Sequence, residues 1–236
     1  MHPVLLKTPY FTIYSYGLCM AFAVLLAWLI STRLARRLSG QQTDVSYSAT
    51  RAADLLFIFF IAGIAGARLF YALQHPSEFT GRWIAVFFFQ EGGLVFYGGL
   101  IAGVACGVIY MRLRRIPVFP WADLFSPVLV LSQAVGRVGC YLNGCCFGRN
   151  GHAVQLYEAS FLIVFSIFLF IRLFRQKMHG EVFVLYLIGY GSARFALEFF
   201  RGDQTSYAGM TSPQWVSLCL VAFGIGLYGY LRRSYR

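Results

Sequence analysis

Residues 121–141, WADLFSPVLVLSQAVGRVGCY, decide the fold class, because they form an apolar stretch with an arginine inside it. A transmembrane helix needs about 20 mostly apolar residues, and this stretch is long enough. Of the 236 residues, 58% are hydrophobic and 12% are charged, whereas soluble domains carry about 25% charged residues. The composition predicts a membrane protein. Arg137 then needs an explanation, since a cation at the centre of a membrane helix costs roughly 2.5–3.5 kcal/mol on insertion scales.

Further stretches along the chain have the same length and apolar character. The candidate spans are 13–33, 52–73, 92–111, 121–141, 154–173, 182–200 and 212–231. We therefore predict an all-α membrane protein, a polytopic bundle of about seven transmembrane helices joined by short loops. One transmembrane domain covers residues 1–236, with no separate soluble domain. Residues 74–91 are aromatic-rich but too short to span, and we expect them to form a periplasmic segment at the membrane interface.

The distribution of basic residues predicts the orientation. Thirteen Lys and Arg residues fall in the loops and helix ends of one side, against four on the other, namely Lys7, Arg82, Arg149 and Arg201. Because short cytoplasmic loops carry the excess of Lys and Arg, the N-terminus is predicted in the periplasm and the C-terminus in the cytoplasm. This topology also accounts for the net charge of +11, so we expect no nucleic-acid partner. No basic region precedes 13–33, which favours a retained span over a cleavable signal.

Polar side chains gather in the outer half of the predicted bundle. Alternating helix directions place residues of five spans at one depth, including Arg68, Tyr97, Arg137, His152, Tyr157, Glu158 and Arg194. In the sixth span, Tyr190, Arg194, Glu198 and Arg201 share one face at 100° per residue. These arginines and glutamates could be structural ion pairs that hold the bundle together. Several arginines with few acidic partners instead favour an anionic ligand, and guanidinium groups bind phosphate through paired hydrogen bonds. A phosphate of a membrane lipid is the ligand expected at that depth.

Glycines and cysteines leave alternatives open. Gly99, Gly103 and Gly107 recur every four residues, which is typical of close helix packing; the paired glycines Gly98 and Gly99 could also let a ligand approach the backbone. Three cysteines cluster near the predicted outer face, Cys140, Cys145 and Cys146. A disulfide, a metal site and a catalytic thiol are each possible there, although no convincing set of metal ligands can be assembled from the sequence.

Several motifs together resemble the prolipoprotein diacylglyceryl transferase family of the bacterial inner membrane. The most specific is Gly136-Arg137-Val138-Gly139 with Asn143-Gly144. The resemblance covers nearly the whole chain. Its other elements are His2-Pro3, Ser15-Tyr16-Gly17-Leu18, Ala67-Arg68-Leu69-Phe70-Tyr71, Glu91-Gly92-Gly93, Gly98-Gly99-Leu100, His152, Gln155-Leu156-Tyr157-Glu158, Tyr190-Gly191, Arg194-Phe195 and Glu198-Phe199-Phe200-Arg201.

The resemblance implies a reaction in which the diacylglyceryl group of phosphatidylglycerol moves to the lipobox cysteine thiol of a prolipoprotein. It implies no metal and no organic cofactor, and no catalytic thiol in this chain, because the nucleophile belongs to the substrate. The residues to which it assigns catalysis are Arg137, Arg194, Tyr190, Tyr97 and Glu198. Those it assigns to substrate binding are Arg68, Asn143, Gly139, Gly98, Gly99, His152, Tyr157, Glu158 and Arg201. The general base is left open among Tyr97, His152 and Glu158.

The chain also departs from the family. Many members have a histidine where this chain has Tyr97, the external head region between Gly148 and Gln155 is very short, and the Cys145-Cys146 pair replaces other residues. Two alternatives remain: a non-catalytic phospholipid-binding or transport protein with an arginine head-group site, and an enzyme that uses the same lipid donor with another acceptor.

Overall fold

The computed structural model describes residues 3–8, 12–41, 45–81, 83–87, 93–201, 206–207 and 209–234. It divides into two compact units, which are described separately here. Unit 1 comprises residues 1–31 and 119–236, and unit 2 comprises residues 32–118. The predicted single transmembrane domain is not tested by this division, since both units consist of apolar helices.

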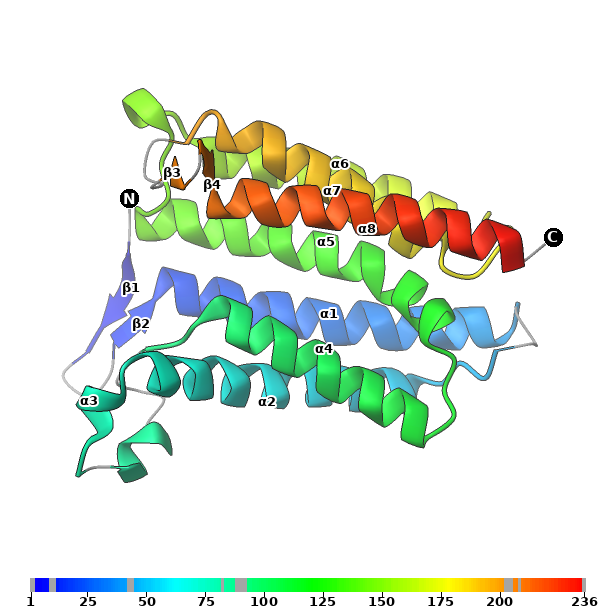
Figure 1. Cartoon of the computed structure of the whole chain (residues 1–236), viewed down its shortest axis with the longest axis horizontal. Coiled ribbons are helices and arrows are strands. Elements are labelled where there is room, and N and C mark those ends of the chain that lie inside the picture. The colour runs from blue at the N-terminus through cyan, green and yellow to red at the C-terminus, as the bar shows by residue number, and fades with distance from the viewer. Residues whose placement is uncertain are drawn as a thin grey trace. The chain divides into compact units, whose positions relative to one another are not determined.

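Unit 1 is built from long helices that run alongside one another (Figure 1). They are the first part of α1 (Ser15–Ser39), then α5 (Val118–Asn143), α6 (Val154–Leu173), α7 (Glu181–Glu198) and α8 (Ser212–Ser234). Helices α7 and α8 pack closely, and α6 contacts α7. The Ser166 hydroxyl of α6 donates to the Pro127 carbonyl of α5 at 2.9 Å. Pro127 lies inside α5. Proline is tolerated within a membrane helix because neighbouring side chains can supply hydrogen bonds to the backbone groups that it leaves without a partner.

A buried carboxylate joins α5 to the start of α7. Asp123 is fully buried, and its two oxygens accept from the backbone N–H groups of Gly180 at 2.5 Å and Phe183 at 2.8 Å. These N–H groups belong to the first turn of α7, which has no carbonyl partners of its own. Asp123 therefore caps α7 from a neighbouring helix.

Unit 2 centres on the packing of α2 (Ala49–Gln74) against α4 (Phe96–Leu113). A Cβ at Gly99 would lie 2.8 Å from the Gly63 carbonyl oxygen of α2, and one at Gly98 would lie 2.4 Å from the Phe70 Cβ. The two backbones therefore approach too closely for side chains. The packing interpretation of the four-residue glycine spacing is confirmed for Gly99, Gly103 and Gly107, which all face α2.

Short elements follow or precede the long helices. In unit 2 these are α3 (Pro76–Phe79) and the 3₁₀ turn η1 (Trp83–Phe87). Of the predicted interfacial segment 74–91, residues 82 and 88–91 lie outside the described residues. Gln74 ends α2, and residues 76–79 and 83–87 form these two short pieces. Two small antiparallel hairpins were not predicted: β1 (Val4–Lys7) pairs with β2 (Thr12–Tyr14), and β3 (Ser206–Tyr207) pairs with β4 (Met210–Thr211).

The all-α membrane class is confirmed, whereas the count of seven spans is not. Six of the described helices are long and apolar enough to cross a membrane. The exception among the predicted spans is α7, whose 18 residues include Glu181, Arg194 and Glu198. Charges at both ends of a helix this short leave no sufficiently apolar window, although its length would still cross most of a bilayer.

Candidate functional site

Arg137 of α5 forms an ion pair with Glu158 of α6. The Arg137 Nε lies 2.9 Å from the Glu158 Oε1, and the Glu158 side chain is almost completely buried. Arg137 occupies the second-last turn of α5 and Glu158 the second turn of α6, so the pair joins two helix ends across a short connection. This ion pair involves the Nε atom of the Arg137 guanidinium. A guanidinium has five N–H donors, so the group can bind a further acceptor.

Tyr190 of α7 adjoins the same guanidinium. Its hydroxyl lies close enough to Arg137 for an electrostatic interaction between the two side chains. Its ring stacks on Tyr186 with centroids 5.7 Å apart, and the Tyr186 hydroxyl accepts from the Gln133 Nε2 at 3.3 Å. Tyr190 is thus held by stacking on Tyr186 and interacts electrostatically with Arg137.

Arg194 follows Tyr190 by one helical turn, on the same face of α7. Its Nη1 lies 2.7 Å from the Glu198 Oε2, and both side chains are buried. Among the described residues this Nη1 has no hydrogen-bond acceptor of suitable geometry. Glu198 is fixed from its other oxygen, which accepts from the Thr211 hydroxyl at 2.9 Å. Thr211 in turn is fixed by its backbone N–H, which donates to the Gln214 Oε1 at 2.9 Å.

Arg201 is not on the polar face of a helix, as the sequence suggested. The α-helix ends at Glu198, and the chain tightens into turns in which the Arg201 N–H donates to the Glu198 carbonyl at 3.1 Å. Arg201 then pairs with Gly148 as an isolated β-bridge, and the Arg149 N–H donates to the Phe200 carbonyl at 2.9 Å. This bridge stops the helix two residues earlier than predicted. The side chain of Arg201 is nevertheless buried, beside Cys146.

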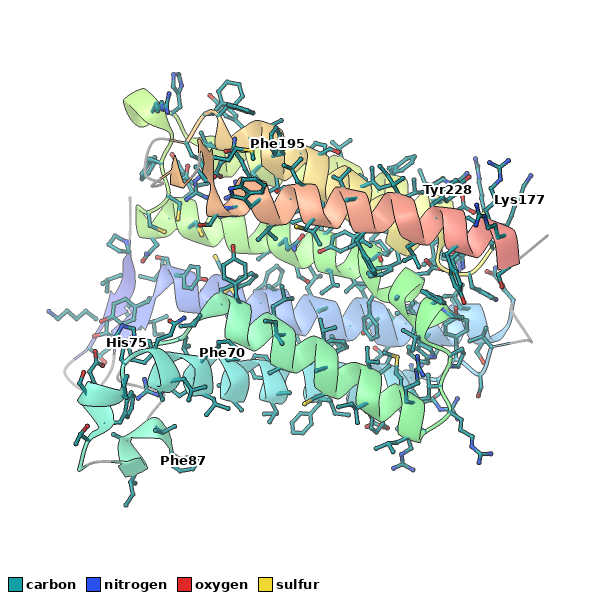
Figure 2. All side chains as sticks on the ribbon, in the orientation of Figure 1. Phe70, His75, Phe87, Lys177, Phe195 and Tyr228 are labelled. Carbon is teal, nitrogen blue, oxygen red and sulfur yellow. The ribbon has the colours of Figure 1, made fainter. Side chains whose placement is uncertain are left out.

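These residues lie at one end of unit 1. Figure 2 places Phe195, the neighbour of Arg194, at the end where β3 and β4 lie, and Lys177 and Tyr228 at the opposite end. Arg137, Arg194 and Arg201 carry three positive charges, and Glu158 and Glu198 carry two negative ones. These five side chains leave one positive charge inside the bundle, which matches one phosphodiester anion.

Arg68 of unit 2 is held in a different way. Its Nε and both Nη atoms donate to backbone carbonyls, at 3.1 Å to Val86, 2.8 Å to Ala85 and 3.3 Å to Gly93. The guanidinium also lies over the rings of Tyr71 and Phe79, at 5.8 and 5.3 Å from their centroids. Arg68 therefore ties the η1 segment and the start of α4 to α2.

A sequence model of the prolipoprotein diacylglyceryl transferase family matches residues 3–230. The chain belongs to this family. Similar relatives include phosphatidylglycerol–prolipoprotein diacylglyceryl transferases of Streptococcus uberis, 31% identical, and Bordetella bronchiseptica, 29% identical. Each alignment covers 98% of this chain and 95% of the relative. One from Streptococcus agalactiae is 30% identical, covering 99% of this chain and 97% of the relative.

The motif that identified the family most specifically lies where α5 meets α1. A Cβ at Gly139 would lie 2.9 Å from the Cys19 Cβ and 3.4 Å from a ring carbon of Tyr16. Gly139 therefore allows α1 to approach α5 two residues beyond Arg137. Its backbone contact with a ligand stays a prediction.

Other residues predicted for the diacylglyceryl transfer site lie at its margins. Asn143, the last residue of α5, is exposed, as are His152 and Tyr157, the last with 58% of its surface accessible. Exposure at this end suits a substrate that arrives from outside the bundle, and their binding roles stay predictions.

Tyr97, Gly98 and Gly99 belong to unit 2. Tyr97, in the first turn of α4, is 42% exposed and packs edge-on against Phe96 with centroids 5.7 Å apart. The packing of Gly98 and Gly99 on α2 accounts for their lack of side chains without a ligand. His2, Glu91 and Gly92 lie outside the described residues, so the expectations that rest on them stay predictions.

Sequence reasoning missed two contributors to the site. Thr211 and Gln214, which fix Glu198, come from β4 and the start of α8. A threonine in a polar loop carries no signal of its own. Gln214 did carry a signal: it lies in the first turn of an apolar helix, where a buried amide needs a hydrogen-bond partner.

Proposed function

We propose that this protein transfers the diacylglyceryl group of phosphatidylglycerol to the thiol of the lipobox cysteine in prolipoproteins, the first step of bacterial lipoprotein maturation. One observation carries the proposal: Arg137 and Arg194 are brought by α5 and α7 to one end of unit 1, each fixed by a buried glutamate. The family membership supplies the reaction, and this cluster supplies groups suited to it.

The chemistry requires a cationic site. The cysteine sulfur forms a bond to the glyceryl carbon while the bond from that carbon to the phosphate oxygen breaks. The thiol loses its proton, and glycerol phosphate leaves with the bonding electron pair. A phosphodiester has one negative charge, whereas a phosphate monoester carries about −1.5 to −2 near neutral pH. Charge therefore grows on the phosphate during the reaction, and donors already aimed at it stabilise the transition state more than the ground state.

Each side chain can be given a role from its contacts. Arg194, with its buried Nη1, and Arg137, with donors beyond its Nε, would bind the phosphate oxygens. Glu158 and Glu198 are positioning residues that hold the two guanidinium groups. Tyr190 would donate to the lipid head group next to Arg137. The proton acceptor for the thiol stays open among Tyr97, His152 and Glu158, of which Glu158 is already paired with Arg137.

The protein is a multi-pass membrane protein, and we place it in the bacterial inner membrane with its N-terminus in the periplasm and its C-terminus in the cytoplasm. The asymmetry of Lys and Arg supports this orientation. When fused to the C-terminus, a reporter that works only in the cytoplasm should be active, and one that works only in the periplasm should be inactive. Activity of a periplasmic reporter at that position would reverse the topology.

The function is tested by incubating the purified protein with phosphatidylglycerol and a lipobox peptide, followed by mass spectrometry of the peptide. We expect the peptide to gain one diacylglyceryl group, with release of one equivalent of glycerol phosphate. A peptide with serine in place of cysteine is the matched control and should remain unmodified. Binding of phosphatidylglycerol without any modified peptide would instead favour a lipid-binding or transport protein.

A further inference from the structure

Three cysteines form a compact group beside the arginine cluster of unit 1. The sulfur atoms of Cys140, Cys145 and Cys146 all lie within 4.8 Å of one another, and all three side chains are half-buried. All three are free thiols. Cys140 is in the last turn of α5, and the other two follow in the connection to α6. A metal–thiolate bond is about 2.3 Å, so three sulfurs around one ion stand roughly 4 Å apart, which needs only a small contraction of this group.

The connection is folded in a way that brings the sulfurs together. Gly144 turns the chain with a φ of +79°, and Cys146 adopts a φ of +65°, which non-glycine residues rarely take. The Cys145 N–H donates to the Cys140 carbonyl at 3.2 Å, and the Gln155 Nε2 donates to the Cys145 carbonyl at 2.6 Å. The backbone between the thiols is therefore fixed from both sides by hydrogen bonds.

The charges around the group suit thiolates. Arg137 interacts electrostatically with Cys140, and Arg201 with Cys146. In the described part of the chain the group contains no His, Asp or Glu. A ligand set of sulfur alone selects soft metal ions over Mg²⁺ or Ca²⁺.

We propose that Cys140, Cys145 and Cys146 form a site for one thiophilic d¹⁰ metal ion, Cu⁺ or Zn²⁺. Three thiolates complete the coordination of Cu⁺, and Zn²⁺ takes water as its fourth ligand. Binding breaks three S–H bonds, forms three metal–sulfur bonds and releases up to three protons. The sequence offered no convincing ligand set and the family resemblance implied no metal. The proximity of the three sulfurs is the observation that changes this expectation.

Metal binding is measured on the reduced, intact protein under anaerobic conditions. Zn²⁺ and Cu⁺ are titrated separately in competition with a chromophoric chelator. We expect one ion per chain for at least one of the two metals. Cys140→Ser, Cys145→Ser and Cys146→Ser should each weaken binding by more than the roughly 10–100-fold typical of a residue that only supports a ligand. The matched control, with Cys19, Cys106 and Cys219 all changed to serine, should bind as the wild type does.

A second measurement uses the wild-type protein alone, so that it does not depend on the folding of variants. Cysteine alkylation is followed by peptide mass spectrometry with and without Zn²⁺ or Cu⁺. The metal should protect Cys140, Cys145 and Cys146 and leave the exposed Cys106 and Cys219 equally reactive. Absence of both binding and protection, or protection shared equally by Cys106 and Cys219, would overturn the proposal. A disulfide within the group in a protein that binds neither ion when reduced would assign it to redox chemistry instead.

Discussion

The buried arginines of the two units are satisfied by different partners. In unit 2, Arg68 donates to three backbone carbonyls and lies over two aromatic rings. In unit 1, Arg137 and Arg194 are each paired with a glutamate from a helix. Both arrangements make a cation tolerable inside an apolar bundle. They differ in what they leave available for a ligand.

Carbonyl bonds from all three guanidinium nitrogens occupy at least three of the five N–H donors of Arg68. A single carboxylate contact occupies one edge of Arg137 or Arg194 and leaves other donors. An anion that binds there adds to an arrangement that is already fixed in position. We therefore propose that Arg137 and Arg194 bind phosphate and that Arg68 has a structural role in unit 2. The substrate-binding role that the family resemblance gives Arg68 stays a prediction.

The largest effect is expected when the arginines of unit 1 are removed. Arg137→Ala and Arg194→Ala should each lower the turnover number by about 10²–10³, the loss typical of one preorganised donor to a developing oxyanion. Arg→Lys should also fail to restore activity, since an ammonium group does not reproduce the guanidinium fork. Transfer to a lipobox peptide is the measurement, and exposed Arg149 changed to alanine is the control. Wild-type turnover in either alanine variant would remove that arginine from the mechanism.

Removal of Arg68 should act on stability first. Arg68→Ala loses three hydrogen bonds from a buried charged group, and each is worth about 1.5–3 kcal/mol. We expect a clearly lower thermal unfolding temperature and faster hydrogen exchange in residues 83–87 and 93–95, which Arg68 holds. The fraction that remains folded should still bind phosphatidylglycerol. A folded, stable Arg68→Ala protein that has lost lipid binding would contradict the division of roles.

A smaller effect is expected at Thr211, whose hydroxyl donates to Glu198. Thr211→Val keeps the shape and removes the hydroxyl, at a cost of about 0.5–1.5 kcal/mol for one hydrogen bond. If Glu198 positions Arg194, the turnover number should fall by up to about tenfold while the Michaelis constant changes little. Thr211→Ser should restore activity, because it keeps the donor. Equal losses in the valine and serine variants would indicate a packing role.

Tyr97→Phe is the mildest change. If the hydroxyl takes the place of the histidine found in many family members, turnover should fall severalfold with lipid binding unchanged. The ring and its contact with Phe96 are retained, so a defect in folding is not expected. Unchanged turnover would assign Tyr97 to packing against Phe96 alone.

The sequence was sufficient for the long helices but not for the partners of the buried arginines. An arginine inside an apolar stretch was enough to single out Arg68, Arg137 and Arg194, because the cost of burying a cation is independent of tertiary detail. It could not distinguish carbonyl partners from carboxylate partners, since these come from segments distant in sequence. Arg201 was placed on a helix because periodicity continues past Glu198, whereas the bridge to Gly148 is a tertiary contact with no local signal. The three cysteines likewise gave an ambiguous pattern until their sulfurs were seen together.

The most direct test of the central claim is the preference of the protein for phosphatidylglycerol over diacylglycerol with the same acyl chains. The two lipids differ by the glycerol phosphate head group, so the ratio of their equilibrium affinities measures head-group recognition, and the variants show the share of each arginine. We predict a strong preference in the wild type, its loss in Arg137→Ala and Arg194→Ala, and its retention in Arg68→Ala. A preference that survives both unit 1 variants and disappears with Arg68→Ala would place the phosphate in unit 2 and contradict the account.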